Sequence, residues 1–180
     1  MAELGEITAK TRVLDLGAGY GGSARYLAAT YGCHVTCLNL SEVENERNRR
    51  MNDEQGLADL IEVIDGSFDD LSFEDNAFDL VWTQDAFLHS GDRTRALEEA
   101  ARVLRPGGEL IISDLMATEG VSEEDLKPIL ERIQLDTLAI PEYYRRELYR
   151  LGANSVEFYD HSEHIARHYQ RVFEELAQTS

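Results

Sequence analysis

A glycine-rich turn is the first feature of the sequence whose residue types and spacing could bind a ligand. Gly17, Gly19 and Gly22 follow the apolar run 12–16 with the spacing G-x-G-x-x-G. Glycines between a strand and a helix let a ligand approach the backbone where a Cβ atom would block it. The spacing is typical of a dinucleotide site, although a simple tight turn would use the same glycines.

Two residues near this turn favour a cationic cofactor over a dinucleotide. A carboxylate at Asp15 suits a ligand with an ammonium group, such as S-adenosylmethionine, and would repel a pyrophosphate; otherwise it could accept hydrogen bonds from loop amides. Asn39 ends the second apolar run, where a nicotinamide site usually has an acidic residue for a ribose hydroxyl. An amide can bond a ribose diol, although more weakly than a carboxylate. The sequence therefore predicts S-adenosylmethionine, with a nicotinamide-dependent oxidoreductase as the alternative.

Polar side chains also follow the third and fourth apolar runs. In the segment 65–68, the Asp65 carboxylate could accept from an adenine amino group while the ring of Phe68 flanks the base. Gln84 and His89 follow the fourth run, next to the crevice where open α/β sheets bind ligands. His89 is a candidate proton acceptor, a positioning residue or an ordinary structural histidine.

These residues need a parallel sheet to bring them together, and the hydrophobic pattern predicts one. Short apolar runs alternate with helix-like segments, which is typical of an α/β fold with a doubly wound, mostly parallel sheet. Strands are expected at 12–16, 34–40, 60–64, 78–83, 109–115 and 154–159. Helices are expected at 21–31, 42–55 with Ser41 as cap, 93–104, 122–139, 141–151 and 162–177. One domain covering residues 1–180 accounts for all of them.

The composition restricts the expected partners. Asp and Glu number 35 against 17 Lys and Arg, and the net charge of −18 repels nucleic acid. The acidic surface either supports solubility or is adapted to high salt, and the scarcity of lysine (only Lys10 and Lys127) favours the second interpretation. No run approaches the roughly 20 apolar residues of a membrane span, and no signal peptide is evident, so we expect a cytoplasmic protein. The sequence does not determine the oligomeric state. Cys33 and Cys37 are expected to be buried free thiols, and no metal site is predicted.

Three segments together resemble the class I S-adenosylmethionine-dependent methyltransferases. They are residues 13–22, 76–81 and 104–110. Residues 15–27, 37–42, 45–49, 65–68 and 84–91 further resemble sarcosine/dimethylglycine N-methyltransferases, which make glycine betaine, and the likeness extends from residue 12 to about 175. Glu44 departs from that pattern, in which Gln is expected.

The resemblance implies a Rossmann-like methyltransferase fold, S-adenosylmethionine as cofactor, and methyl transfer to the amine of sarcosine or dimethylglycine. The N-terminal helical lid and the last antiparallel strand of such enzymes are not recognisable here, so a cofactor-binding core with little activity is an alternative. The predicted cofactor-binding residues are Asp15, Gly17, Ala18, Gly19, Tyr20, Asn39, Leu40, Asp65, Gly66, Ser67, Phe68, Gln84 and His89.

The methyl acceptor is not determined by these residues. Methyl transfer needs an aligned, neutral amine, so a dedicated base is optional and no catalytic residue is predicted. A small amino acid would need an arginine for its carboxylate and aromatic faces for its ammonium group. The candidates are Arg93, Arg145, Arg146 and Arg167 for the first role and Tyr143, Tyr144, Tyr159 and Tyr169 for the second. Another small acceptor, such as phosphoethanolamine or a lipid-like molecule, is the alternative.

Overall fold

Five strands form one parallel sheet in the computed structural model, which describes residues 1–2, 5–165, 167 and 170–171. They are β1 (Arg12–Leu16), β2 (His34–Asn39), β3 (Ile61–Asp65), β4 (Phe78–Gln84) and β5 (Leu104–Ser113). The strand order is β3-β2-β1-β4-β5, and each neighbouring pair is parallel. The order reverses direction between β1 and β4, which is where open α/β sheets form a ligand crevice. The predicted doubly wound parallel sheet is confirmed.

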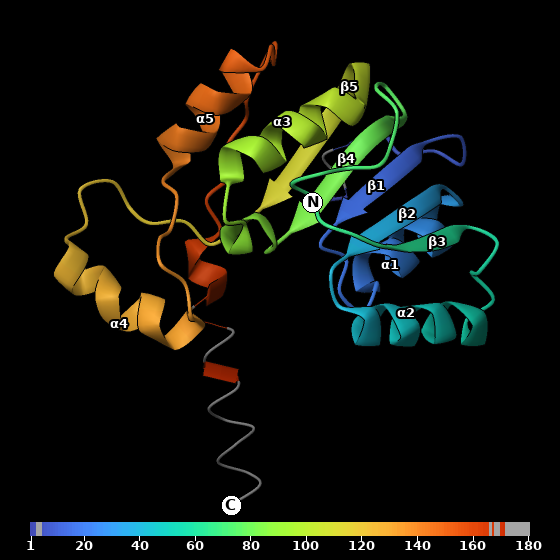
Figure 1. Cartoon of the computed structure of the whole chain (residues 1–180), viewed down its shortest axis with the longest axis horizontal. Coiled ribbons are helices and arrows are strands. Elements are labelled where there is room, and N and C mark those ends of the chain that lie inside the picture. The colour runs from blue at the N-terminus through green and yellow to red at the C-terminus, as the bar shows by residue number, and fades with distance from the viewer. Residues whose placement is uncertain (3–4, 166, 168–169, 172–180) are drawn as a thin grey trace, which may run out of the picture.

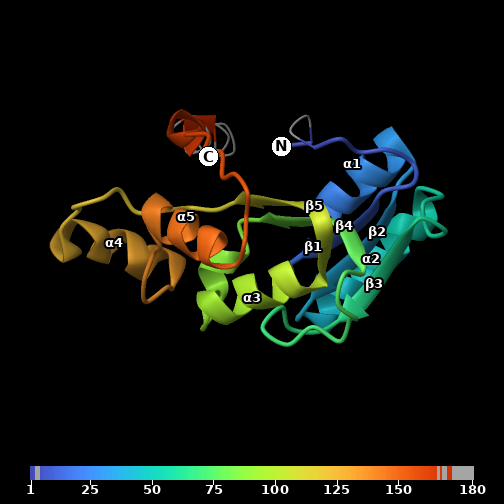
Figure 2. The same ribbon diagram turned by 90° about the horizontal axis from the view of Figure 1, so that it is seen from above.

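Helices cover both faces of the sheet (Figures 1 and 2). The helices are α1 (Gly22–Tyr31), α2 (Glu42–Glu54), α3 (Arg93–Val103), α4 (Glu123–Ile133) and α5 (Pro141–Arg150). Alternate residues of β1 explain the two layers: Val13 packs with Leu27 of α1, whereas Leu14 packs with Leu97 of α3 on the other face. Figure 2 shows α1 and α3 on opposite sides of the sheet, with α5 beside α3.

Local sequence signals set the helix ends. At the start of α2 the Ser41 hydroxyl accepts from the N–H of Glu44 at 3.4 Å. At the start of α3 the Asp92 carboxylate accepts from the N–H of Arg95 at 3.0 Å. Gly32 closes α1 in the left-handed conformation, with φ of 68°. The helices predicted at 21–31, 42–55, 93–104 and 141–151 are therefore confirmed, with ends that differ by about one residue.

The sixth strand predicted at 154–159 is wrong. Within the described residues this segment pairs with no strand, and the Val156 carbonyl oxygen accepts from the Arg145 guanidinium at 3.4 Å instead. Phe158 and Tyr159 are exposed. A segment with a suitable pattern becomes a strand only where a neighbouring strand bonds its backbone groups, and in the described residues no strand lies beside this one.

Two predicted boundaries also differ from the structure. The helix predicted at 122–139 ends at Ile133, because Gln134 adopts φ of 56° and its N–H donates back to the Leu130 carbonyl. The strand predicted at 109–115 already begins at Leu104 and ends at Ser113, with an irregular register at its start.

Of α4 and α5, which follow β5, α5 packs beside α3 whereas α4 lies apart from the sheet. No residue of α4 is buried, and this helix projects from the body of the molecule (Figures 1 and 2). The helix predicted at 162–177 starts at Ser162, but most of it, including His168 and Tyr169, lies outside the described residues. In the described part of the chain, no helix is both long enough and apolar enough to cross a membrane. Cys33 and Cys37 are buried free thiols, as predicted.

Candidate functional site

The ends of four neighbouring strands place predicted ligand-binding residues in one row. Asn39 of β2 lies opposite Asp65 of β3 in the strand register. Leu16, which precedes Gly17, lies opposite Leu38 of β2 and Thr83 of β4. Asn39 and Gln84 are the next residues of those two strands, so they lie on either side of Gly17. Adjacent strands are about 4.8 Å apart, and the row from Asp65 to Gln84 therefore spans about 14 Å. That length suits an extended nucleoside ligand.

The glycine-rich turn fits tightly between β1 and its neighbours. Gly17 has φ of 75°, and a Cβ atom there would lie 2.3 Å from the Cβ of Ala86. The N–H groups of Gly17 and Ala18 both donate to the carbonyl oxygen of Leu38, at 2.8 and 3.1 Å. The start of the turn is thus fixed to β2, and only glycine fits at its first position.

Within the turn, Gly21 rather than Gly22 is the second glycine whose neighbours leave no room for a side chain. Gly21 has φ of 72°, and a Cβ atom there would lie 2.1 Å from Oδ1 of Asn48 in α2. Gly22 begins α1 and, like Gly19, would place its Cβ in open space. In the sequence spacing G-x-G-x-x-G the third glycine is Gly22, but the glycine in close contact with α2 is Gly21.

A buried arginine supports the turn from the helix side. Arg25 of α1 is 8% exposed, and its Nη1 donates to the Tyr20 carbonyl oxygen at 2.7 Å. The same nitrogen donates to Oδ1 of Asn48 at 3.2 Å and of Asn52 at 3.1 Å. Sequence reasoning missed this network. The helical spacing of Asn45, Asn48 and Asn52, which places three amides on one face of α2, is the signal that could have found it.

Asp15 lies beneath the turn rather than on the surface of the sheet edge. Its register neighbours are Cys37 and Trp82, which share its face of the sheet. Asp15 is 2% exposed, and its Oδ2 has no hydrogen-bond partner among the described residues. Burial raises the pKa of this carboxyl to about 7. The pairing of Asp15 with a ligand ammonium group stays a prediction, because the ligand would have to reach below the turn.

Helix α2 holds Asn39 and Asp65 in place. Nδ2 of Asn45 donates to Oδ1 of Asp65 at 2.8 Å and to the Asn39 carbonyl oxygen at 2.9 Å. The Arg49 guanidinium donates to Oδ2 of Asp65 at 2.7 Å. Nδ2 of Asn39 donates to Oε2 of Glu44 at 3.0 Å. Hydrogen bonds from Asn45 and Arg49 lower the pKa of Asp65, which is therefore an ionised acceptor at neutral pH.

Exposed apolar groups lie next to this row. Leu40, directly after β2, is 69% exposed, and Tyr20 in the turn is 49% exposed. The Arg47 guanidinium lies over the Tyr20 ring at 5.3 Å from its centroid, beside a hollow of about 290 Å³ that Val43 also lines. Apolar side chains beside hydrogen-bond acceptors match the two kinds of surface that a nucleoside base presents.

The loop after β3 continues the row. The Gly66 N–H donates to the last carbonyl oxygen of β2 at 3.2 Å. The Ser67 hydroxyl accepts from the N–H of Asp69 at 3.2 Å, which shapes the loop. The ring of Phe68 packs edge to face against Phe87, with centroids 5.5 Å apart. The loop is therefore held both to β2 and to the segment after β4.

Two polar residues follow β4 at the same edge. Gln84 ends the strand, and its Oε1 accepts from the hydroxyl of Ser23 in α1 at 2.9 Å. His89 ends the short 3₁₀ helix η1 (Phe87–His89) and is exposed. Both residues are exposed, and their contact with a ligand along the row stays a prediction.

The backbone of Leu88, the residue before His89, is held at both its N–H and its carbonyl group. The Leu88 N–H donates to Oδ1 of Asp114 at 3.2 Å, and the Leu88 carbonyl accepts from Nη2 of Arg93 at 3.0 Å. The Tyr144 hydroxyl donates to Oδ2 of Asp114. Burial raises the pKa of Asp114 to about 6. The position of His89 thus depends on a partly buried network that sequence reasoning did not find.

The arginines and tyrosines predicted to meet an acceptor have partners within the protein. Arg93 bonds Leu88 and Thr137, Arg145 bonds Val156 and Glu142, Arg146 bonds Glu147, and Arg167 bonds Glu163. Tyr143 bonds Thr94, Tyr144 bonds Asp114, and Tyr159 bonds Glu157. An acceptor role for these described residues therefore stays a prediction.

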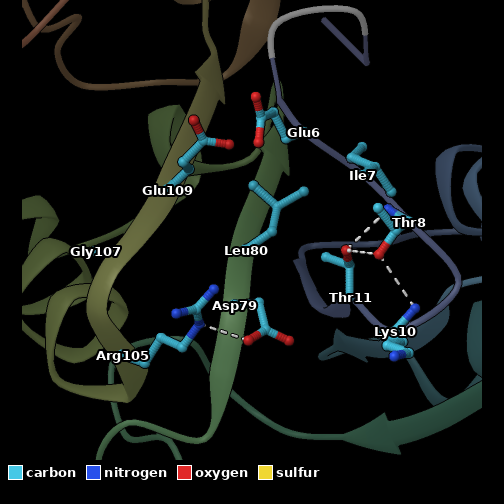
Figure 3. Close-up of a pocket in the computed structure, with 10 residues that line it drawn as sticks. All are labelled: Glu6, Ile7, Thr8, Lys10, Thr11, Asp79, Leu80, Arg105, Gly107 and Glu109. Atoms are coloured by element: carbon cyan, nitrogen blue, oxygen red, sulfur yellow. Dashed lines mark hydrogen bonds and ion pairs between the residues drawn. The ribbon is translucent and has the colours of Figure 1, made fainter.

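A separate cavity of about 360 Å³ lies at the opposite, amino edge of the sheet (Figure 3). Its lining mixes both charges. Nε of Arg105 lies 2.6 Å from Oδ1 of Asp79, and a dashed line in Figure 3 marks this ion pair. Glu6, Lys10 and Glu109 also line it. The predicted ligand-binding residues are at the carboxyl edge, so this cavity is not part of the candidate site. In the described part of the chain, no group of three or more His, Cys, Asp or Glu side chains could hold a metal ion.

Comparison with known proteins identifies one family model, described as a methyltransferase domain, that matches residues 14–112. The chain is 59% identical to a glycine/sarcosine/dimethylglycine N-methyltransferase of Actinopolyspora halophila over 98% of its own length and 31% of that protein. It is 57% identical to a sarcosine/dimethylglycine N-methyltransferase of Halorhodospira halochloris, over 91% of the chain and 59% of that protein. The chain thus spans about a third and three-fifths, respectively, of these two curated relatives.

A solved structure has nearly the same fold. The crystal structure of a protein of Galdieria sulphuraria, provisionally assigned as a sarcosine dimethylglycine methyltransferase, superposes with a TM-score of 0.93 at 40% identity. The match covers 98% of this chain and 67% of that chain. The predicted resemblance to this group of methyltransferases is confirmed.

Proposed function

Because the chain belongs to the methyltransferase domain family, we propose that it binds S-adenosylmethionine along the carboxyl edge of its sheet and transfers the methyl group to an amine. The proposed acceptor is sarcosine or dimethylglycine, and methylation of dimethylglycine yields glycine betaine. The observation that carries the proposal is the row Asp65, Asn39, Gly17 and Gln84, which lies within the family match.

The chemistry of this row fits the proposed cofactor. Asn39 and Asp65 offer oxygen acceptors to ribose hydroxyls and to an adenine amino group. The exposed side chain of Leu40 offers an apolar surface to the base. The unpartnered Oδ2 of Asp15 is a buried acceptor beneath the turn, and an ammonium group is a donor that would satisfy it.

The residues of the chain would act mainly by alignment. When bound, S-adenosylmethionine supplies a methyl group on a sulfonium sulfur, which the lone pair of a neutral amine displaces. The close packing of Gly17 against Ala86 and of Gly21 against Asn48 restricts the turn, so a bound cofactor would keep a constant position relative to β4. His89 is the exposed imidazole at this edge and can accept the proton that an ammonium acceptor must lose.

The choice of acceptor rests on the named relatives. Two relatives at 57–59% identity carry names that include sarcosine and dimethylglycine. The acidic composition is consistent with a salt-adapted cytoplasmic protein, and betaine is an osmoprotectant, so charge and product agree. That agreement is an association rather than a mechanism.

Calorimetry and a transfer assay test the proposal together. We expect S-adenosylhomocysteine to bind the chain while NAD does not, and labelled methyl to pass to sarcosine and dimethylglycine rather than to phosphoethanolamine. Asn39→Ala should weaken S-adenosylhomocysteine binding about tenfold, because a polar acceptor in the row is lost. Glu6→Gln, in the cavity at the amino edge, is the control and should bind normally.

Each part of the proposal can fail separately. Absence of binding to either S-adenosyl compound would overturn the cofactor assignment. Binding without transfer to any acceptor would overturn the catalytic assignment for this chain. Transfer to phosphoethanolamine alone would replace the proposed acceptor. Equal losses in the Asn39 and Glu6 variants would place the ligand elsewhere.

A further inference from the structure

Asp114 is a partly buried carboxylate that contacts the backbone next to His89 and that the proposed reaction does not use. It directly follows β5 at the carboxyl edge of the sheet. Its Oδ1 accepts from the Leu88 N–H at 3.2 Å, and its Oδ2 accepts from the hydroxyl of Tyr144 in α5. One side chain thus joins β5, η1 and α5 at a single point.

The imidazole of His89 is held through its backbone. Among the described residues its side chain makes no hydrogen bond or ion pair, and it lies exposed at the end of η1. The first residues of a helix leave N–H groups without a partner inside that helix. Ala86, which precedes η1, has no side-chain oxygen to accept from them, and the Asp114 carboxylate supplies one from another element. The place of the imidazole therefore depends on Asp114.

Tyr144 fixes the orientation of this carboxylate. The tyrosine is 2% exposed and packs with the core residues of α3. Burial and the neighbouring carboxylate raise the pKa of the Tyr144 hydroxyl above its usual range, so this group stays protonated and donates. Loss of the donor would leave Oδ2 of a partly buried carboxylate unsatisfied. The bond to α5 therefore keeps Asp114 turned toward Leu88.

We propose that Asp114 and Tyr144 are positioning residues for His89: Tyr144 orients the Asp114 carboxylate, which caps η1 and so holds the imidazole at a constant place on the carboxyl edge. Both act through the backbone of η1, and neither touches the acceptor. The inference rests on the proposed methyl transfer with His89 as proton acceptor. It gives α5, which carries no residue of the row, a part in the rate of the reaction rather than in cofactor binding.

Three other roles for these side chains make different predictions. A purely structural tyrosine would lower stability without acting through His89. A Tyr144 ring in contact with the acceptor ammonium group would tolerate Tyr144→Phe, because the ring face remains. A negative charge of Asp114 that acted directly on His89 would be lost in Asp114→Asn. Hydrogen bonding would survive in that variant, because the amide keeps an acceptor for the Leu88 N–H and a donor for the Tyr144 oxygen.

Hydrogen exchange of the Leu88 amide, followed by NMR, tests the contact without any substrate. The rate is compared with that of the buried Leu14 amide in β1, which reports opening of the whole fold. Tyr144→Phe and Asp114→Ala should each speed exchange at Leu88 about tenfold relative to Leu14, because the N–H loses its acceptor. Asp114→Asn should change it less than about threefold. Tyr149→Phe, which removes an exposed hydroxyl from the same helix, is the control and should match the wild type.

Methyl transfer measured near pH 8, where Asp114 is ionised, tests the consequence. Tyr144→Phe should lower kcat about tenfold and change the affinity for S-adenosylhomocysteine less than about twofold, because only the imidazole is displaced. His89→Asn should lower kcat roughly a hundredfold. The double variant should equal His89→Asn to within about twofold, because the hydroxyl acts only through the imidazole. Tyr149→Phe should keep the wild-type kcat.

Separate results would overturn each step of the inference. Unchanged exchange at Leu88 in Tyr144→Phe would show that the hydroxyl does not hold Asp114 in place. A double variant about tenfold slower than His89→Asn would show that Tyr144 acts independently of the imidazole. An unchanged kcat in His89→Asn would remove the group that is positioned. Equal losses in Asp114→Asn and Asp114→Ala would replace hydrogen bonding by charge.

Two further measurements keep these outcomes distinct. Thermal melting identifies a variant that has not folded, and if Tyr144→Phe is one, Asp114→Ala combined with His89→Asn gives the same comparison. If the wild-type chain transfers no methyl group, the proposed function fails and the effect on rate fails with it. Exchange at Leu88 still decides in that case whether Asp114 and Tyr144 hold η1.

Discussion

Burial of Asp15 in the fold favours its protonated form, whereas the proposed contact with a ligand ammonium group needs its carboxylate. A carboxyl group that is exposed in the unfolded chain has its usual pKa near 3.8, and burial raises the pKa of Asp15 to about 7. Between these values the unfolded chain has released this proton while the folded chain retains it. The contribution of Asp15 to stability therefore falls as pH rises from about 4 to about 7, and then stays constant.

Replacing Asp15 by Asn should remove this pH dependence. We expect the free energy of unfolding of the wild type to fall by about 2 kcal/mol more than that of Asp15→Asn between pH 5.5 and pH 8, because the Asn side chain has no proton to lose. Urea unfolding at the two pH values measures the difference.

The exposed Asp70 provides the control for this prediction. Asp70→Asn should follow the wild type at both pH values, and an Asp15→Asn protein that did the same would contradict the assigned pKa. The same variant also tests the predicted ammonium contact. Weaker S-adenosylmethionine binding without a lower melting temperature would support that contact, whereas lost stability with intact affinity would refute it.

At the scale of elements, the turn after β1 takes its shape from the helices that pack around it. Asn48 of α2 occupies the space where a side chain on Gly21 would lie, and Arg25 of α1 bonds the Tyr20 carbonyl oxygen. These contacts join α1 and α2 to the turn before any ligand is present. A rigid turn of this kind lowers the cost of ordering the backbone around a cofactor.

The two adjacent glycines at the start of α1 should therefore respond differently to alanine. Gly21→Ala should lower the free energy of unfolding by about 2 kcal/mol or more, because its Cβ would meet the Asn48 amide and its φ of 72° disfavours alanine. Gly22→Ala should be neutral or stabilising by up to about 1 kcal/mol, because its Cβ meets open space.

Urea unfolding of both variants checks this difference. Adding Asn48→Ala to Gly21→Ala should recover part of the loss, because the colliding amide is then removed. Equal stabilities of the Gly21 and Gly22 variants would show that Asn48 does not restrict the turn.

At the scale of the whole molecule, the dominant feature is a net charge of −18 on 180 residues. Several carboxylates pair with arginines, as Glu99 does with Arg95 and Arg102, but about half of the negative charge has no positive counterpart in the composition. Uncompensated charge of one sign repels itself in a compact state. Dissolved salt shortens the range of that repulsion.

Moderate salt should therefore stabilise the folded chain. Raising potassium chloride from about 0.02 to about 0.3 M should raise the melting temperature by roughly 3–6 °C at pH 7.5, as the screening length falls from about 20 Å to about 6 Å. Sodium bromide at the same ionic strength is the control and should produce the same rise. A flat response, or a rise with only one of the salts, would exclude screening as the cause.

The sequence by itself determined the strands of the sheet, most of the helices, the glycine-rich turn and the family. These features depend on apolar periodicity and capping residues within about a dozen positions, so short windows contain the information. Residues 12–16, which form β1 and lead into Gly17, are such a case. The polar row could also be predicted, because parallel strands place their carboxyl ends at one edge.

Only the tertiary structure decided which side chains meet. Asn45 bonds Asp65, which is 20 positions away in the sequence, and Arg25 bonds Asn48, which is 23 positions away. The helical spacing places the amides on one face of α2, but it does not identify these partners. The strand predicted at 154–159 is wrong for the same reason. Its side-chain pattern suits a strand, but no strand lies beside it in the described residues to pair with its backbone. Tertiary packing also explains why Glu44, which in sequence looked only like a departure from the family, is found beside Asn39.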